Sequence, residues 1–490
     1  MQDSEDPPSS LRLLTLNCWG LKYISKLRPE RLAEIGRRIA SLPEPPHIVA
    51  LQECWVTSDY DAIRAETSHI LPHGKFYYSG PFGGGLAILS RWPITSSSMH
   101  RYPLNGRPTA FFRGDWFVGK GIAHATITLP GTPPSGGGGG GGAQTISIFN
   151  THTHAPYTEN RPGDTYLAHR LSQSWELSKL LKAATERGHL VLALGDFNMR
   201  PLTLPHTLIT SHAPVHDAWR VLHPESSLGA ATDPLEVSRG QPAPTAAYNL
   251  AENGATSDTV YNTWRWPKSQ QKQLGEGKPP IKVPPDTIDR KGKRLDYIFL
   301  GNPVPPRADG GTWVVRDAAV GMVEPHPTLR CSLSDHFSVE AMLTYHVPSQ
   351  ASGDEPSRRP DPIPRLTEQL EPARADGLPV AVYDEILSVI RAYVQREEKQ
   401  RYWRGSHFFA WLIVLVGCLV AVWFSPHNGV AFVLVLLSSL GLVAGVLDGL
   451  MSLLFFNSEL RALKEFEWEI TNAKRIVTVT SGKLEETKLI

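Results

Sequence analysis

The sequence predicts an α/β sandwich, with sheets inside and helices outside, followed by a C-terminal helical hairpin that crosses a membrane. Two observations support this fold class. Short apolar runs typical of buried strands recur through the first two thirds of the chain, and helical patterns lie between several of them. Two much longer apolar runs stand near the C-terminus, separated only by a turn.

The strand-like runs define a domain over residues 1–346. They occupy 11–17, 47–53, 85–90, 146–152, 189–196, 295–300 and 337–343, with helical patterns at 29–42 and 166–186. The glycine-rich stretch 134–143 indicates a flexible insertion between two strands. Residues 225–290 are rich in Pro, Gly and polar residues, which predicts a long surface excursion.

The C-terminal runs 407–424 and 430–456 are each long enough to cross a bilayer, which takes about 20 apolar residues. Arg401 and Arg404 precede the first run, Arg461 and Lys464 follow the second, and the link between the runs has no Lys or Arg. The positive-inside rule therefore places both ends of the hairpin in the cytosol. The alternative is a buried helical pair in a soluble core, but the runs are longer than ordinary core helices.

The segments around the hairpin differ in composition. Residues 347–379 form a Pro-rich linker, and apolar residues at helical spacing predict an amphipathic juxtamembrane helix over 380–406. The charged tail 457–490 is expected in the cytosol, either on the membrane surface or as a solvated helix. The acidic N-terminal stretch "MQDSEDPPSS" matches neither a signal peptide nor a transit peptide.

Charge and cysteine content restrict the class of protein. The net charge of +1 argues against a protein that binds nucleic acid by neutralising phosphates. The four cysteines form no C-x-x-C pair, and one of them lies in an apolar run. This usage favours a reduced, cytosol-facing protein over a disulfide scaffold.

Polar and charged residues collect at the ends of the predicted strands. They are Asn17, Glu53, His152, His154, Asp196, Asn198, Asp296, Asp335 and His336. Turns favour Gly, Pro, Asn, Asp and Ser, but not Glu and His. Because open α/β sheets bind ligands at the carboxyl ends of their strands, this set predicts an active site. For His154 alone, a hydrogen-bonded loop histidine is the favoured alternative.

The residue types suit hydrolysis of a phosphodiester with a divalent cation. Oxygen ligands with few thiols favour Mg²⁺, and Glu53 is the best single ligand candidate, with Asn17 beside it. Two histidines near such a metal can supply a base and a hydrogen-bond donor. A carboxylate is then needed to orient the basic histidine.

Six motifs together resemble the DNase I-like phosphodiesterase superfamily. They are "LTLNCWG", "VALQE", "NTHTHA", "LALGDFNMRP", "RLDYIFL" and "LSDHFSV", in order over about residues 11–346. The resemblance implies a four-layer sandwich, in which two central, mostly antiparallel sheets are flanked by helices. The membrane hairpin, "RGDWFVGKG" and "TSDTVYNTW" look like the branch of membrane-bound neutral sphingomyelinases and fungal inositol phosphosphingolipid phospholipases C.

The resemblance also implies roles for the metal-binding and phosphate-binding residues. Glu53 would hold Mg²⁺ with help from Asn17. His152 and Asn198 would contact the phosphoryl oxygens and stabilise their charge during an in-line displacement.

A second group would activate the attacking water. The resemblance implies that His336 is the general base and that Asp196 helps to position the nucleophile. Either Asp296 or Asp335 would orient His336.

The stretch "GDWFVGKG" has the spacing of a phosphate-binding Walker A loop, but Gly121 stands where that loop needs Ser or Thr. A nucleotide site is therefore not expected. In the resembling branch, the residues that match Asp115 and Lys120 act in catalysis and in coupling to lipid activators. We expect Lys120 to pair with Asp115 or with a substrate phosphate; the alternative is an incidental surface lysine.

Together these features predict a Mg²⁺-dependent phospholipase C that converts a phosphosphingolipid into ceramide and a phosphorylated head group. The head group is phosphoinositol or phosphocholine. A nuclease and a catalytically inactive, membrane-tethered interaction domain are the alternatives. The charge and the hairpin argue against the first, and the complete residue set argues against the second.

The partners follow from the same resemblance. The sphingolipid substrate lies in the membrane, anionic phospholipids are expected as activators, and no nucleic acid is expected. The endoplasmic reticulum and the mitochondrial outer membrane both fit a cytosol-facing hairpin. Oligomeric state stays open.

Overall fold

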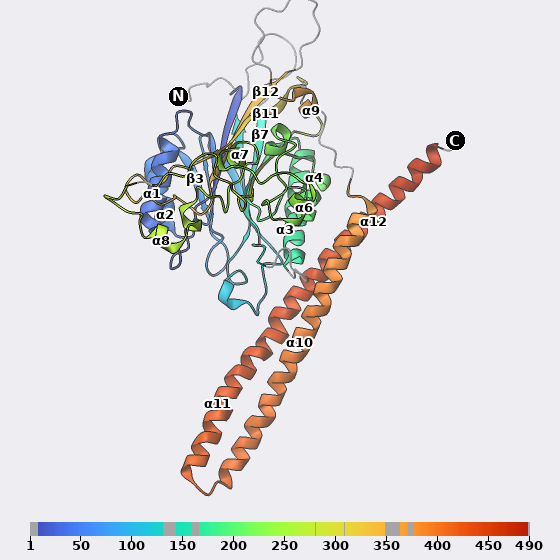
Figure 1. Cartoon of the computed structure of the whole chain (residues 1–490). Coiled ribbons are helices and arrows are strands. Elements are labelled where there is room, and N and C mark those ends of the chain that lie inside the picture. The colour runs from blue at the N-terminus through green and yellow to red at the C-terminus, as the bar shows by residue number, and fades with distance from the viewer. Residues whose placement is uncertain are drawn as a thin grey trace, which may run out of the picture. The chain divides into compact units, whose positions relative to one another are not determined.

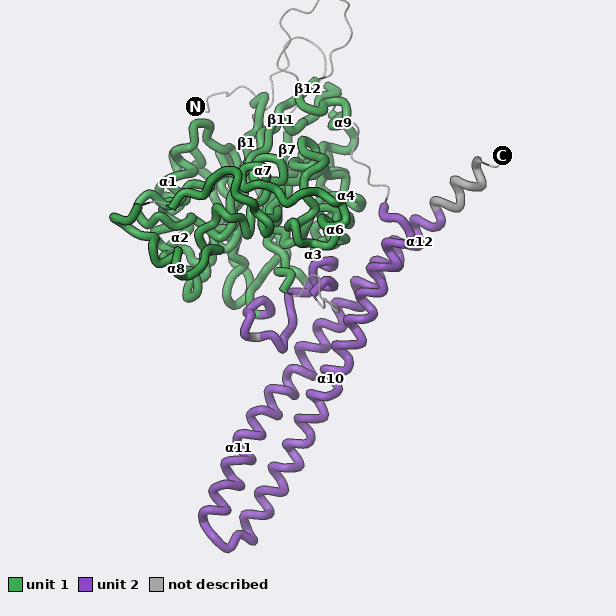
Figure 2. The backbone as a smooth tube through the Cα atoms, viewed as in Figure 1, with its two compact units in different colours: residues 1–102, 117–164, 173–376 green, residues 103–116, 165–172, 377–490 purple. Residues whose placement is uncertain are grey.

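The chain is divided into two compact units. The computed structural model describes residues 8–130, 144–157, 166–279, 281–307, 309–347, 363–370 and 377–488 (Figure 1). Unit 1 consists of residues 1–102, 117–164 and 173–376, and unit 2 of residues 103–116, 165–172 and 377–490 (Figure 2). The glycine-rich stretch 134–143 and most of the predicted linker 347–379 lie outside the described residues.

Unit 1 contains two six-stranded sheets. The first has the order β11 (Thr312–Gly321), β12 (Ser338–His346), β1 (Ser10–Asn17), β2 (Ile48–Gln52), β4 (Leu86–Ser90) and β3 (His73–Tyr77). The second has the order β5 (Ile94–Arg101), β6 (Gly121–Leu129), β7 (Gln144–His152), β8 (Leu190–Asp196), β10 (Asp296–Gly301) and β9 (His216–Asp217). Each sheet has one parallel pair, β1–β2 or β7–β8, and its other pairs are antiparallel.

Both faces of each sheet are covered, which explains why the inner strands are continuously apolar. Side chains from both sheets meet in a central core, among them Leu13 of β1 and Ile148 of β7. The helices α1 (Arg28–Ala40) and α2 (Thr57–Thr67) pack on the outer face of the first sheet. The outer face of the second sheet is covered by α3 (Leu167–Glu186), through its residues from Leu177 onward, and by α4 (Leu204–His212). Figure 1 shows α1 and α2 on one side of the strands and α4 on the other. The predicted four-layer sandwich is confirmed.

All seven predicted strands and both predicted helices are present. Five further strands were not predicted: β3, β5, β6, β9 and β11. Four of these are the edges of the two sheets, and edge strands carry polar residues instead of a continuous apolar run. The strand β5, for example, has the polar sequence "ITSSSMHR" and only exposed and half-buried residues.

The prediction of a surface excursion over 225–290 is wrong for part of that region. It carries α6 (Pro234–Ser238), α7 (Ala246–Ala251), a 3₁₀ turn at Thr263–Arg265 and α8 (Lys268–Gln271), after α5 (Ala218–Leu222). Thr256, Ser257 and Asn262 are buried. The side chains of Thr256 and Asn262 and the backbone of Ser257 form hydrogen bonds beside the strand ends, which a composition-based interpretation does not detect.

Unit 2 contains the predicted hairpin. It is formed by α10 (Val380–Trp423), α11 (Asn428–Leu450), a π-helical turn (Met451–Phe455) and α12 (Phe456–Lys488). The juxtamembrane helix and the first apolar run form one continuous helix, α10. The short helix α9 (Leu366–Leu370) belongs to unit 1. The helical stretches Val380–Trp423 and Asn428–Val479 each contain an apolar segment long enough to span a membrane.

The two apolar helices pack through glycine. Gly441, Gly445 and Gly449 follow one another at four-residue spacing on α11, and a Cβ at Gly441 would lie 1.9 Å from the ring of Trp411 on α10. Small residues at this spacing allow close helix approach in lipid. Apolar side chains such as Ile413 and Phe432 stay exposed, which fits a lipid-facing surface better than the alternative of a soluble core.

Candidate active site

The site is built where the two sheets present the carboxyl ends of their parallel strands. In the first sheet, Asn17 of β1 is in register with Gln52 of β2, and Glu53 follows directly. In the second sheet, His152 of β7 is in register with Asp196 of β8. The antiparallel strand β10 begins at Asp296, opposite Asp196. The topology therefore brings side chains from five distant segments to one place.

The glycine of the "GDFN" motif has a steric role. Gly195 has φ 149°, and a Cβ there would lie 2.0 Å from the carbonyl oxygen of Thr151. Only glycine allows β7 and β8 to pair so closely just before Asp196. After it, the backbone N–H of Asn198 donates to Oδ1 of Asp196 at 3.0 Å, which fixes the turn.

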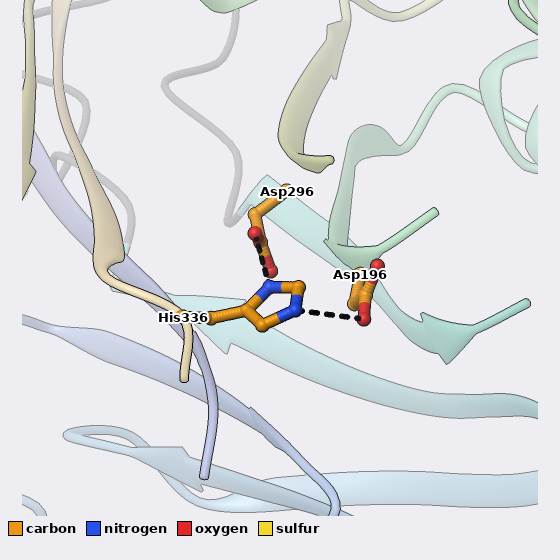
Figure 3. A group of neighbouring side chains, drawn as sticks. All are labelled: Asp196, Asp296 and His336. Carbon is orange, nitrogen blue, oxygen red and sulfur yellow. Dashed lines mark hydrogen bonds and ion pairs between the residues drawn. The ribbon is translucent and has the colours of Figure 1, made fainter. Parts of the chain in front are cut away.

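His336 is held by Asp296 (Figure 3). Its Nδ1 lies 2.8 Å from Oδ2 of Asp296, and Thr256 donates its hydroxyl to the same oxygen at 2.5 Å. The other ring nitrogen, Nε2, lies 4.0 Å from Oδ2 of Asp196. Burial alone would lower the pKa of His336. The carboxylates of Asp296 and Asp196 outweigh burial and hold this pKa well above its ordinary value.

Asp335, the other carboxylate considered for orienting His336, points elsewhere. Its Oδ2 lies 3.8 Å from Nη2 of Arg265, and 22% of its side chain is exposed. Of the two carboxylates left open by the sequence, Asp296 is therefore the one that contacts the imidazole.

Asn17 joins two buried carboxylates. Its amide Nδ2 donates to Oδ2 of Asp196 at 2.9 Å and lies 3.3 Å from Oε1 of Glu53. Burial, reinforced by the charge of Asp335, raises the pKa of Glu53 to about 7. Burial, reinforced by the charge of Asp296, raises the pKa of Asp196 to about 6. The site thus concentrates negative charge in a poorly solvated place.

These groups fit a divalent cation. Among the described residues, Oε2 of Glu53 is buried and has no hydrogen-bond partner. A carboxylate oxygen of this kind, next to an amide and a second carboxylate, is a suitable ligand for Mg²⁺. Asp196, Asp296 and His336 also have a spacing that could hold a metal, with ligand atoms within 4.8 Å of one another. The 2.8 Å contact between Asp296 and Nδ1 of His336, however, is the geometry of a hydrogen-bonded acid–imidazole pair.

His152 lies beside a buried lysine. Nζ of Lys120 lies 3.3 Å from Nε2 of His152 and donates to the carbonyl oxygen of Thr153 at 3.1 Å. Burial and the charge of Lys120 lower the pKa of His152 well below its ordinary value, which favours the neutral ring. Nδ2 of Asn198 donates to the same carbonyl at 3.2 Å. Asp115 is buried in unit 2, and its pairing with Lys120 stays a prediction.

His154 is hydrogen-bonded within its loop. Its backbone N–H donates to Gln173 at 2.7 Å, and its Nδ1 lies 2.8 Å from the carbonyl oxygen of Ala155. These contacts fit the alternative of a loop histidine.

Two residues of the site were not predicted. Thr256 donates to the carboxylate of Asp296, and Ser334 accepts from the backbone N–H of His336 at 3.2 Å. Both belong to motifs quoted for the resemblance, "TSDTVYNTW" and "LSDHFSV", but a buried hydroxyl cannot be told from a turn residue by its position in the sequence.

The Endonuclease/Exonuclease/phosphatase family profile matches residues 14–336, which include the carboxyl ends of both parallel strand pairs and His336. The chain belongs to this family. Within it, the chain is 36% identical to the inositol phosphosphingolipids phospholipase C of Schizosaccharomyces pombe over 473 residues, covering 96% of each protein. It is 33% identical to the protein of the same name from Saccharomyces cerevisiae, over 95% of this chain and 90% of that one.

A third relative is similar over a shorter length. Human sphingomyelin phosphodiesterase 2 is 34% identical over 209 residues, 43% of this chain and 46% of that protein. The predicted family branch and the predicted class of phosphoric diester hydrolase are confirmed by these relatives.

Proposed function

We propose that this chain is a Mg²⁺-dependent phospholipase C that hydrolyses inositol phosphosphingolipids to ceramide and a phosphorylated inositol head group. The observation that carries the proposal is the arrangement of His336. Its Nδ1 is bound to Asp296, and its Nε2 faces Asp196 on the side of the Asn17–Glu53 pair. The similarity to two fungal proteins named for inositol phosphosphingolipids, over nearly the whole chain, supports the choice of head group.

The chemistry follows from these contacts. Nε2 of His336 accepts a proton from a water molecule as the water oxygen attacks phosphorus. The bond between phosphorus and the ceramide oxygen breaks, and ceramide leaves as an alcohol after taking up a proton from solvent water. The Asp296 carboxylate stabilises the imidazolium that forms and fixes the ring orientation. Asp196 lies 4.0 Å from Nε2 and positions the water.

The remaining side chains act on the phosphate. Mg²⁺ bound by Glu53 and Asn17 would neutralise phosphoryl charge. The neutral ring of His152, the ammonium of Lys120 and the amide of Asn198 lie together and would donate to the phosphoryl oxygens. Each of these donors is buried, which strengthens its electrostatic effect.

We also propose that the hairpin of unit 2 anchors the protein with both ends in the cytosol. Arg401, Arg404, Arg461 and Lys464 flank the apolar helices on one side, as the positive-inside rule requires. The same charges would attract anionic phospholipids, which we propose as activators. The endoplasmic reticulum and the mitochondrial outer membrane both fit this orientation.

The proposal is tested with the full-length protein in detergent–lipid mixed micelles. Inositol phosphosphingolipid, sphingomyelin, lysophospholipid and DNA are offered with Mg²⁺ or EDTA. We expect ceramide from the inositol lipid with Mg²⁺ only, and loss of turnover in His336→Ala. The matched control is His69→Ala, because His69 is exposed and lies outside the site. Cleavage of DNA without cleavage of lipid would refute the proposal.

A further inference from the structure

Unit 1 contains a pocket whose lining includes Asp258, two residues after Thr256 of the proposed catalytic centre. It has a volume of about 520 Å³, within the range typical of small-molecule sites. Asp258, Arg265, Trp266, Lys282, Arg290 and Lys291 are among its lining residues. None of these six was a predicted site residue.

The backbone connects this pocket directly to the catalytic histidine. Thr256 donates to Asp296, and the next residue, Ser257, forms a β-bridge with His336. The following residue, Asp258, already lines the pocket and has φ 60°. The lining of the pocket therefore begins one residue after the backbone partner of His336 and two residues after the partner of Asp296.

Arg265 is fixed between the pocket and the catalytic centre. Its Nε lies 2.7 Å from Oδ1 of Asp258, and its Nη2 lies 3.8 Å from Oδ2 of Asp335, the neighbour of His336. Lys293 holds the other oxygen of Asp258 at 3.1 Å. Because 43% of the Arg265 side chain is exposed, the guanidinium can still bind a ligand in the pocket.

The charge that the pocket presents to solvent is positive. Lys282, Arg290 and Lys291 are exposed at its rim. Of the acids, Asp258 is neutralised by its two ion pairs, and Asp289 is fully buried and accepts hydrogen bonds from Gly292 and Asn249. The guanidinium group of arginine and the ammonium group of lysine are suited to bind hydroxyl and phosphate oxygens.

The pocket is poorly suited to choline. Quaternary ammonium groups are recognised by aromatic faces, and cations at the rim would repel them. Trp266 is the one aromatic side chain among the described lining residues, and its Nε1 donates to the carbonyl oxygen of Val260 at 2.7 Å.

We propose that this pocket is the subsite for the hydroxyl-bearing inositol ring of the substrate's head group, and that Arg265, Arg290 and Lys291 determine head-group specificity. The inference rests on the proposed function and names the residues that select the inositol head group over choline. The phosphate of an anionic membrane lipid has related chemistry, and the experiment distinguishes it from the substrate's own head group.

The main test compares two substrates in the same mixed micelles. In Arg290→Glu/Lys291→Glu we expect kcat/KM for inositol phosphosphingolipid to fall about tenfold or more, while kcat/KM for sphingomyelin is unchanged or rises. Lys268→Glu/Lys272→Glu is the matched control, because both lysines are exposed on or beside α8 and neither lines the pocket. Equal losses on the two substrates would overturn the proposal.

Two binding measurements separate the subsite from the other possibilities. Calorimetry with inositol 1-phosphate should give weaker binding for the double variant than for the wild type, and phosphocholine should show no such difference. Co-sedimentation with phosphatidylserine vesicles should be unchanged; loss of vesicle binding with an unchanged substrate ratio would mean that the pocket binds membrane lipid, and would overturn the proposal.

Two further results have defined meanings. If the double variant melts at a lower temperature than the wild type, Arg265→Gln takes its place with the same expected change in substrate ratio. If the wild type hydrolyses neither lipid, the proposed function fails, whereas the inositol 1-phosphate measurement still decides the subsite.

Discussion

Nδ1 of His336 lies 2.8 Å from Oδ2 of Asp296, and no part of the Asp296 side chain is exposed to solvent. The contact leaves Nε2 as the ring nitrogen that can exchange a proton with water. A buried carboxylate in this place fixes the ring and stabilises its protonated form. The rate and its pH dependence should therefore both depend on Asp296.

The first prediction concerns Asp296→Asn. We expect kcat to fall by about 10²–10⁴-fold, as in other acid–histidine pairs. The Asp296 carboxylate raises the pKa of His336, so its removal should lower that pKa and move the acid limb of the pH–rate profile to lower pH. Asp317→Asn, on the exposed part of β11, is the control. An acid limb that does not move would show that Asp296 does not set the pKa of the base.

The second prediction separates Asp335 from Asp296. Asp335 faces Arg265 at 3.8 Å, whereas Asp296 holds the imidazole, so Asp335→Asn should reduce kcat less than about tenfold. Its acid limb should stay close to that of the wild type. The measurement is the pH profile of both variants on one substrate, and a larger loss for Asp335→Asn than for Asp296→Asn would reverse the assignment.

The third prediction concerns the metal. EDTA should abolish turnover, and Glu53→Gln should weaken Mg²⁺ binding at least about tenfold, because the neutral amide cannot balance the cation. The readout is Mg²⁺ titration by calorimetry without substrate, together with the rise in melting temperature on adding Mg²⁺. Glu66→Gln, on α2 and away from the strand ends, is the control. Unchanged Mg²⁺ affinity in Glu53→Gln would place the metal elsewhere, with Asp196 and Asp296 as the next candidates.

The sequence was sufficient to predict every inner strand except β6, and the residues at the ends of those strands. Strands such as β8 are buried on both faces and therefore stand out as apolar runs, and the polar residues that interrupt them, such as Asp196, stand out in turn. The edge strands lack this signal, since one side of each is free of a neighbouring strand.

Contacts made across long sequence distances were not predictable. Choosing Asp296 over Asp335 needs the register of β10 against β8, although Asp335 is the nearer residue in sequence to His336. Thr256 and Arg265 lie in a stretch whose composition resembles that of a loop, and their roles follow only from the β-bridge between Ser257 and His336. Single-sequence patterns report periodicity and burial, but they carry no information about which distant polar groups meet.

The last prediction concerns two buried glutamates of unit 2, Glu397 on α10 and Glu459 on α12. Oε1 of Glu459 accepts from the hydroxyl of Tyr393 at 2.7 Å and lies 3.1 Å from Nε2 of His169. Burial raises the pKa of each glutamate to about 7, and the charge of Glu459 adds to the shift of Glu397. Burial lowers the pKa of His169 to about 4, so that ring stays neutral at higher pH.

Carboxyl groups with raised pKa values bind protons more tightly in the folded state. The contribution of these two groups to the packing of α12 on α10 should therefore be fully present below pH 4.5 and be lost as the pH rises through about 7. For each glutamate, the loss is at most about 1.4 kcal/mol for each pH unit. Hydrogen exchange over residues 456–470, in detergent at pH 6 and pH 8, measures this loss. Glu459→Gln should reduce the difference between the two pH values, whereas Glu465→Gln, which changes an exposed residue of the same helix, should keep it. Equal pH dependence in both variants would show that the buried pair does not control this packing.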